Sequence, residues 1–135
     1  MKRYCFPYKK EPSRVLGEIY RPVVEFHVGA KDKEWILVSA YADSGADITI
    51  FPKTVCALIG LELRKGERSI ITGVSGAGIA FYIHKVRIKI GDKELKIRAG
   101  FAETENIPYL LGRTDILEHF DILFQSDRVC FIEKD

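Results

Sequence analysis

The sequence predicts an all-β domain with one or two short helices. Apolar residues alternate with polar ones at 24–28, 86–90 and 95–99, which is the period-two pattern of strands with one face on a core. A more continuously apolar run at 35–42 predicts a buried strand. With 135 residues, 47% of them hydrophobic and 30% charged, the chain has the size and balance of one globular domain.

The segments before and between these strands complete the predicted order. Residues 1–14 lack periodicity, and we expect an N-terminal arm there, ahead of a domain at 15–135. A loose turn at 29–33 separates two early strands, and Gly91-Asp92 is a good hairpin turn between two later ones.

Two segments lack the alternating pattern of strands. Pro52 stands at a first-turn position and Gly60 at a stop position, so the sequence between them predicts a short helix. A second short helix is expected at 114–120. The segment 120–132 then predicts a last hairpin, with its turn at the Ser-Asp pair in the middle.

The charge balance excludes several classes of partner. Lys and Arg total 21 against 19 Asp and Glu, an excess too small to predict a nucleic-acid or membrane partner. Basic residues such as Lys85, Arg87 and Lys89 alternate with apolar ones, and we interpret them as the solvated face of a strand.

Cysteine and histidine usage argues against metal chemistry. The three cysteines are scattered without a C-x-x-C pair, which speaks against a disulfide framework and a zinc site. The three histidines are also isolated, so no metal and no other cofactor is expected. The longest near-apolar run, 35–42, is too short to span a bilayer, and a cytoplasmic protein is the default expectation.

An acidic residue follows the buried strand directly, in Asp43-Ser44-Gly45. An ionised carboxylate at such a strand end is costly unless donors satisfy it. A glycine two positions on lets a backbone N–H approach it, and a hydroxyl can orient it. The same residue types are also common in plain turns. A surface turn rarely stands between two apolar runs, however, and the apolar run 48–51 follows, which favours a functional interpretation.

Two motifs carry a resemblance to a known family. The segment 42–47, Ala-Asp-Ser-Gly-Ala-Asp, resembles the active-site signature of the retroviral and retrotransposon aspartic proteases. The segment 110–113, Leu-Leu-Gly-Arg, is similar to the apolar-apolar-Gly-Arg motif downstream in that family. The resemblance extends over about residues 23–124 and implies the closed β-barrel of the retropepsin fold. Because the signature occurs once, it also implies a homodimer in which each chain supplies one Asp43.

The glycine-rich segment 70–79 lies between the two motifs. It lacks the Gly-Lys-[Ser/Thr] ending of a phosphate-binding loop, and a strand pattern follows it. It therefore predicts a hairpin, similar to the flap that closes over peptide substrate in this family. The substrate contacts expected there are Gly73, Val74, Ser75 and Gly76.

The resemblance implies a role for each matching residue. Asp43 would be the catalytic carboxylate, with Ser44 and Gly45 supporting it. Arg113 would brace the loop by pairing with Asp47, which would also bind the peptide main chain. The other implied substrate contacts are Ala46, Ile48, Pro108 and Leu110, and the other implied structural supports are Leu111 and Gly112.

The implied function is an aspartic endopeptidase that cleaves peptide bonds with a water activated between two Asp43 carboxylates. Two alternatives stay open: a catalytically silent module of the same fold that binds extended peptides, and a structural β-domain. The sequence departs from the minimal viral length at both ends. The dimer interface is therefore expected to differ from interleaved terminal strands, with the hairpin at 120–132 as a candidate.

Overall fold

The computed structural model describes residues 1–72, 76 and 78–134. Strands cover 58% of the chain and helices 7%, so the all-β prediction is confirmed. The elements are β1 (Arg3–Pro7), β2 (Lys9–Ser13), β3 (Gly17–Arg21), β4 (Val23–Gly29), β5 (Trp35–Ala42), β6 (Thr49–Phe51), α1 (Lys53–Leu58), the 3-10 helix η1 (Leu63–Lys65), β7 (Glu67–Thr72), β8 (Gly78–Ile90), β9 (Lys93–Ala102), β10 (Leu110–Leu111), β11 (Phe120–Phe124) and β12 (Arg128–Glu133).

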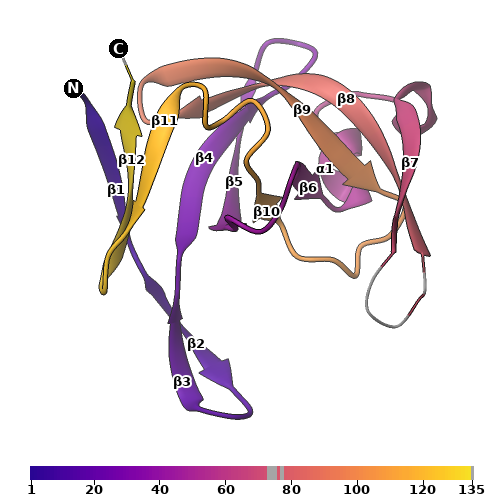
Figure 1. The fold of residues 1–135 in the computed structure, drawn as a ribbon. Coiled ribbons are helices and arrows are strands. Elements are labelled where there is room, and N and C mark those ends of the chain that lie inside the picture. The colour runs from indigo at the N-terminus through magenta and orange to yellow at the C-terminus, as the bar shows by residue number, and fades with distance from the viewer. Residues whose placement is uncertain (73–75, 77, 135) are drawn as a thin grey trace.

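Six strands close into a barrel (Figure 1). The order is β4-β5-β10-β6-β9-β8, and pairing between β4 and β8 completes the ring. β7 extends the sheet beyond the barrel as the outer strand of a hairpin with β8. The closed barrel that the resemblance implied is thus confirmed. Inside it, the rings of Phe26, Phe51 and Phe101 pack in series, with centroids 6.2 and 5.4 Å apart.

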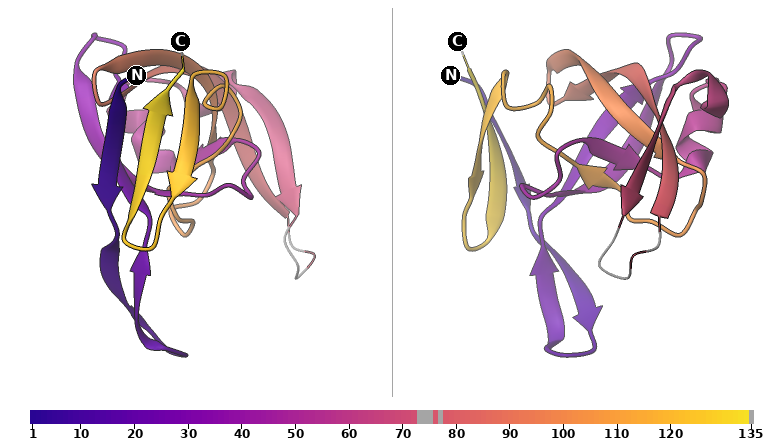
Figure 2. Two further views of the ribbon diagram at one scale, coloured as in Figure 1. Left: turned by 60° about the vertical axis from the view of Figure 1, so that its left-hand side comes forward. Right: turned by 45° about the vertical axis from the view of Figure 1, so that its right-hand side comes forward.

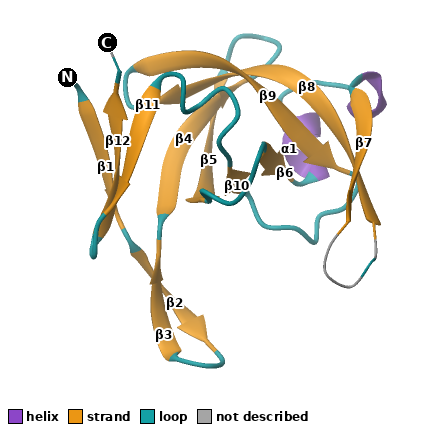
Figure 3. Ribbon diagram, viewed as in Figure 1, coloured by secondary structure: helices purple, strands orange, loops and turns teal. Residues whose placement is uncertain are grey.

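One of the two expected helices forms. α1 begins after Pro52, whose φ of −63° suits a helix start, and Gly60 follows its end with a φ of +80°. Val55 and Cys56 bury the inner face of α1 in the core. Figure 3 shows the helix next to β6. In the part of the chain that the structure describes, no helix has the length and apolar character needed to cross a membrane.

The prediction of a helix at 114–120 is wrong, because the segment forms a series of turns. Asp115 has a φ of +68°, which no α-helix accommodates. Its carboxylate accepts hydrogen bonds from the Arg98 backbone N–H, Nε and Nη2 at 2.9, 2.9 and 3.0 Å. A seven-residue helix is marginal on its own, so this long-range contact decides the local conformation. The same Arg98 guanidinium lowers the pKa of Asp115 below its usual range.

Replacing Asp115 by Asn tests that contact. Asn tolerates positive φ as well as Asp does, so the change removes mainly the charge. A lowered pKa means that Asp115 stabilises the fold above the ordinary Asp range and loses this effect as pH falls toward the folded-state value. We expect Asp115→Asn to unfold at lower urea concentration near neutral pH, and the difference from wild type to shrink below about pH 4. Asp92→Asn, in an exposed turn, is the control; a pH-independent difference for Asp115→Asn would contradict the assignment.

The two chain ends form a second, three-stranded sheet beside the barrel, in the order β1-β12-β11 (Figure 2). Residues 1–14, interpreted as an arm, supply β1 and one strand of the β2–β3 hairpin, which projects away from the barrel in all views. The hairpin predicted at 120–132 is confirmed as β11–β12. Phe120 and Phe131 bury its inner face against the core.

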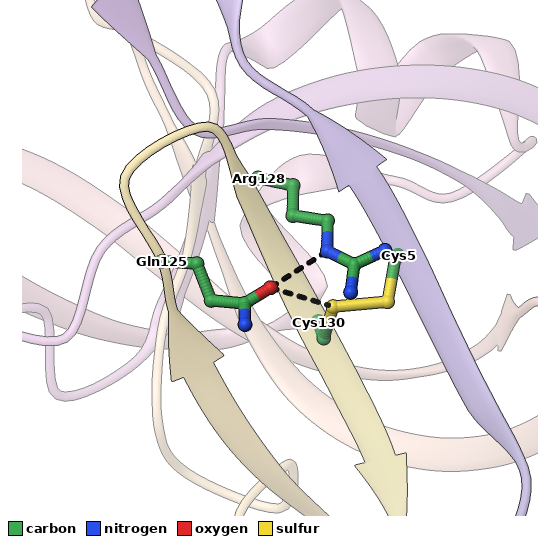
Figure 4. Close-up of a disulfide and its surroundings, with 4 residues drawn as sticks. All are labelled: Cys5, Gln125, Arg128 and Cys130. Carbon is green, nitrogen blue, oxygen red and sulfur yellow. Dashed lines mark hydrogen bonds between the residues drawn. A yellow bond between two sulfur atoms is a disulfide. The ribbon is translucent and has the colours of Figure 1, made fainter.

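The expectation against disulfides is wrong for one pair. Cys5 and Cys130 face each other across β1 and β12, with Cα atoms 4.0 Å apart, and form a disulfide (Figure 4). Arg128 and Gln125 lie beside it, where Arg128 Nε donates a hydrogen bond to Gln125 Oε1 at 2.6 Å. Spacing rules miss this pair because 125 residues separate the two cysteines and only strand register brings them together. Cys56 remains free and buried.

Candidate active site

Asp43 lies at the carboxyl end of β5, where the chain leaves the barrel. Its backbone N–H donates to the Leu111 carbonyl at 3.0 Å, which continues the parallel pairing of β5 with β10 by one residue. The Gly45 N–H donates to Asp43 Oδ1 at 2.9 Å. A Cβ on Gly45 would lie 3.3 Å from that oxygen, so glycine permits the close approach. Asp43 as a residue is half-buried, and Ser44 and Gly45 are exposed.

Gly112 crosses directly behind this loop. Its N–H donates to Thr49 Oγ1 at 3.0 Å, and a Cβ on Gly112 would lie 2.5 Å from the Ile48 carbonyl carbon and 2.9 Å from the Ala46 oxygen. No side chain fits there without moving the backbone. Thr49 is fully buried, and sequence reasoning missed it. A hydroxyl inside the apolar run 48–51 was the available signal, since buried hydroxyls need a partner.

The ion pair expected between Arg113 and Asp47 forms, from Nη2 to Oδ1. Backbone bonds reinforce it: the Arg113 N–H donates to Ala46 O at 3.0 Å, and the Thr114 N–H donates to Asp47 O at 2.9 Å. The Asp47 side chain is 86% exposed, so the pair contributes little to stability. Its effect is to hold the two loops in one relative orientation.

A cavity of about 120 Å³ opens beside Asp43. The strand ends and loops line one side of it, and the C-terminal segment lines the other with Leu117, Ile122 and Phe124. Leu117 and Phe124 are 38% and 43% exposed, and Ile122 is partly buried. We call these three side chains the apolar rim. Sequence reasoning did not assign them to the site, because only the fold brings the end of the chain next to residue 43.

Pro108 lies in a neighbouring depression of about 330 Å³ with Tyr41 and Tyr109. The base of the β2–β3 hairpin forms another wall, where Tyr41 Oη donates to the Glu11 carboxylate at 2.8 and 3.0 Å. This hydrogen bond raises the pKa of Tyr41, and burial and the Glu11 charge add to it. Residues 39, 41 and 43 alternate with buried residues on β5, so the depression and Asp43 share the outer face.

The remaining expected contacts fall in the segment between β7 and β8. Gly73, Val74 and Ser75 lie outside the described residues. Gly76 is exposed and has a φ of +79°. The described part of the β7–β8 hairpin carries exposed apolar side chains. They are Ile70, Ile71 and Ile79.

The fold therefore joins most of the residues that the sequence singled out. It brings 43–48 against 110–113, with Leu110 paired to both Tyr41 and Ile50, and it places Pro108 one depression away. Within residues 1–72, 76 and 78–134, no three His, Cys, Asp or Glu side chains gather as a metal site.

A closed barrel with an Asp-Ser-Gly loop at one strand end and a Gly-Arg crossing behind it is the architecture of the retropepsin-like aspartic proteases, and this chain has that fold. It is similar to a retropepsin-like aspartic protease from Rickettsia conorii, with a TM-score of 0.70 and 18% identity over 96% of this chain and 98% of that one. It is also similar to EIAV protease in complex with the inhibitor HBY-793, with a TM-score of 0.54 and 24% identity over 73% of this chain and 86% of that one. No family model and no curated protein matches the sequence. The resemblance stated from the two motifs is confirmed at the level of fold.

Proposed function

We propose that the chain is an aspartic endopeptidase that acts as a homodimer with one Asp43 from each subunit. The observation that carries the proposal is the Asp43 loop. A carboxylate held by the Gly45 N–H ends a barrel strand, and the Gly112 crossing supports it from behind. One chain supplies one such carboxylate, so a two-fold axis beside Asp43 would complete the site.

The mechanism follows from two carboxylates in close contact. Like charges at that distance do not both ionise, so the pair shares one proton. The ionised Asp43 acts as general base on a water molecule, which attacks the peptide carbonyl carbon. The partner's Asp43, protonated, donates a hydrogen bond to the carbonyl oxygen. A proton then passes to the leaving nitrogen as the C–N bond breaks, with no covalent intermediate.

The remaining side chains position the subunits and the substrate. Ser44 hydrogen-bonds across the two-fold axis, and Gly45 and Asp47 bind the peptide main chain. The β7–β8 hairpin closes over an extended peptide as a flap, adding strand-type hydrogen bonds. Tyr41 and Pro108 accept a substrate side chain, which favours large apolar residues next to the cleaved bond. The other expected contacts are Ala46, Ile48 and Leu110.

The apolar rim is the proposed subunit contact. The rim places two exposed apolar side chains, Leu117 and Phe124, together beside the proposed catalytic carboxylate, and adjoining exposed apolar side chains are typical of an interaction site. β1 already pairs with β12 of its own chain, and β11 is the edge strand nearest the cavity. Two β11 edges related by a two-fold axis would extend the terminal sheet through the dimer and bury both rims.

Replacing Phe124 by Lys tests this interface. Two lysines would face each other across the axis, so we expect the dimer to dissociate at least about tenfold more readily. Sedimentation velocity over a range of concentrations measures the change. The control is Leu58→Lys, which adds the same charge to a side chain 57% exposed at the end of α1. Equal dimerisation of Phe124→Lys, Leu58→Lys and wild type would exclude the rim as the contact.

Cleavage of a peptide library, read by mass spectrometry from acid to neutral pH, tests the activity. We expect cuts between large apolar residues, and we expect a statine-containing peptide, which mimics the tetrahedral intermediate, to block them. Asp43→Asn is the matched inactive protein. A folded, dimeric wild type that binds extended peptides but cuts none would reject the protease in favour of the peptide-binding module.

The compartment is also open to test. The cytoplasm was the default expectation from sequence, whereas the Cys5–Cys130 disulfide favours an oxidising compartment. Thiol labelling of the protein taken directly from its cells would separate the two, since reduced Cys5 and Cys130 support a cytoplasmic location.

A further inference from the structure

A strongly basic surface lies on the outer face of the β8–β9 hairpin. Lys85 stands directly opposite Arg98, and Arg87 directly opposite Lys96. The residues between them on β8, such as Val86, are buried in the barrel, so these four basic side chains share the outer face.

The β4–β5 turn converts this surface into a pocket. Lys31 and Lys33 stand at the turn, and together with the hairpin they enclose a depression of about 330 Å³. Its base is apolar. The lining residues are Gly29, Ala30, Lys31, Lys33, Leu61, Lys85, Val86, Arg87 and Lys96. We call this depression the basic pocket.

No acidic side chain balances the basic pocket among its lining residues. Within the described residues, none of its four lysines, nor Arg87, has a carboxylate oxygen within 4.0 Å. Of the nearby acids, Asp115 binds Arg98. Asp32 and Glu34 stand in the β4–β5 turn, where Asp32 Oδ1 accepts the Glu34 N–H at 3.0 Å, and neither lines the pocket.

One cation of the pocket is held in place without a ligand. Arg87 Nη2 donates to the Ala30 carbonyl at 3.2 Å, and the guanidinium lies 4.7 Å from the centre of the Trp35 ring. The Lys89 ammonium lies 4.6 Å from the same ring. Contacts of this kind restrict the side chain before any ligand binds, so less side-chain entropy is lost on binding.

Like charges placed directly opposite each other in a sheet destabilise it. The hairpin has two such pairs, and only one of them, Lys85 with Arg98, has an acidic side chain bound to a member, Asp115 on Arg98. A local arrangement that opposes stability is typical of a binding site. The interpretation of Lys85 and Arg87 as a merely solvated face does not account for the concavity beside them. Asp115 lines the adjoining depression with Lys85 and Lys96, but its ion pair is with Arg98.

We propose that the basic pocket binds a small multivalent anion of the phosphate-ester or polyphosphate class. Lysine ammonium groups suit phosphate oxygens as point charges, and a fixed arginine adds a directional donor. The volume lies at the lower end of the range for small-ligand sites and is too small for a folded partner. The pocket contains none of the residues proposed for peptide hydrolysis, so each proposal can be tested independently of the other.

Inorganic tripolyphosphate is the probe, with binding followed by calorimetry at two salt concentrations. We expect Lys85→Gln/Lys96→Gln to bind it at least about tenfold more weakly than wild type. Lys2→Gln/Lys10→Gln, which removes the same charge from exposed positions near the N-terminus, should stay within about twofold. Saturating tripolyphosphate should raise the Tm of wild type and of the control.

Three results would overturn the proposal. Equal weakening in both double variants would mean that net charge alone attracts the anion. The second result is that tripolyphosphate does not bind, whereas a single-stranded oligonucleotide binds through Lys85 and Lys96. The ligand of the pocket would then be a polymer and not a small anion. The unliganded Lys85→Gln/Lys96→Gln protein should be at least as stable as wild type, because its like-charge pairs are gone. A lower Tm would assign the lysines a structural role instead.

Discussion

Replacing Asp43 by Asn should reduce kcat for peptide cleavage by at least about 10³-fold, because an amide cannot take the proton of the attacking water. The side chain remains the same size, and its Oδ1 still accepts the Gly45 N–H, so fold and dimer should persist. Circular dichroism and sedimentation check both. Cleavage retained in Asp43→Asn would remove the dyad mechanism altogether.

A shared site makes a second, sharper prediction for the same variant. When wild type is mixed with an equal amount of Asp43→Asn and the subunits exchange, half of all dimers contain one carboxylate. The activity per wild-type chain should then fall to about half, whereas independent sites would leave it unchanged. The Phe124→Lys form of Asp43→Asn is the control. A variant that cannot pair should not inhibit wild type.

Replacing Gly112 by Ala should destabilise the protein by about 2–3 kcal/mol, since the new methyl group would overlap the Ile48 backbone 2.5 Å away. For a domain of this size that corresponds to a fall in Tm of roughly 5–10 °C. The clash lies behind the Asp43 loop, so activity at low temperature should fall as well.

Gly17→Ala separates this effect from the general cost of losing a glycine. Gly17 has a φ of +78° but nothing within 4 Å of an added Cβ, so the change should cost only about 1 kcal/mol, from the left-handed backbone. Thermal unfolding of both variants gives the comparison. A Gly112→Ala protein as stable as Gly17→Ala would show that the crossing yields easily and does not brace the loop.

The elements that depend on local pattern were predictable from the sequence. β5 begins at Trp35 and ends at Ala42, the limits of the apolar run, and α1 lies between Pro52 and Gly60. The close approach of the motifs at 42–47 and 110–113 could be predicted only from the family resemblance, because 63 residues separate Thr49 from Gly112.

The features that depend on distant contacts were not predictable. The turn at Asp115 follows from a bond to Arg98, and β1 is a strand because β12 pairs with it. The local sequence of these two segments favours no single conformation strongly, so the distant contacts determine the conformation of each. The apolar rim could not be predicted for the same reason. In the sequence alone, Phe124 does not differ from any other hydrophobic residue near a chain end.

The Cys5–Cys130 disulfide turns almost the whole chain into a covalent ring. A single broken peptide bond anywhere between residues 5 and 130 would leave two fragments that still travel together. If the protein cuts itself in a loop, a non-reducing gel would show one band of unchanged mass, and the fragments would separate only after a thiol is added. Any count of intact molecules in a preparation of this protein therefore needs a reduced sample.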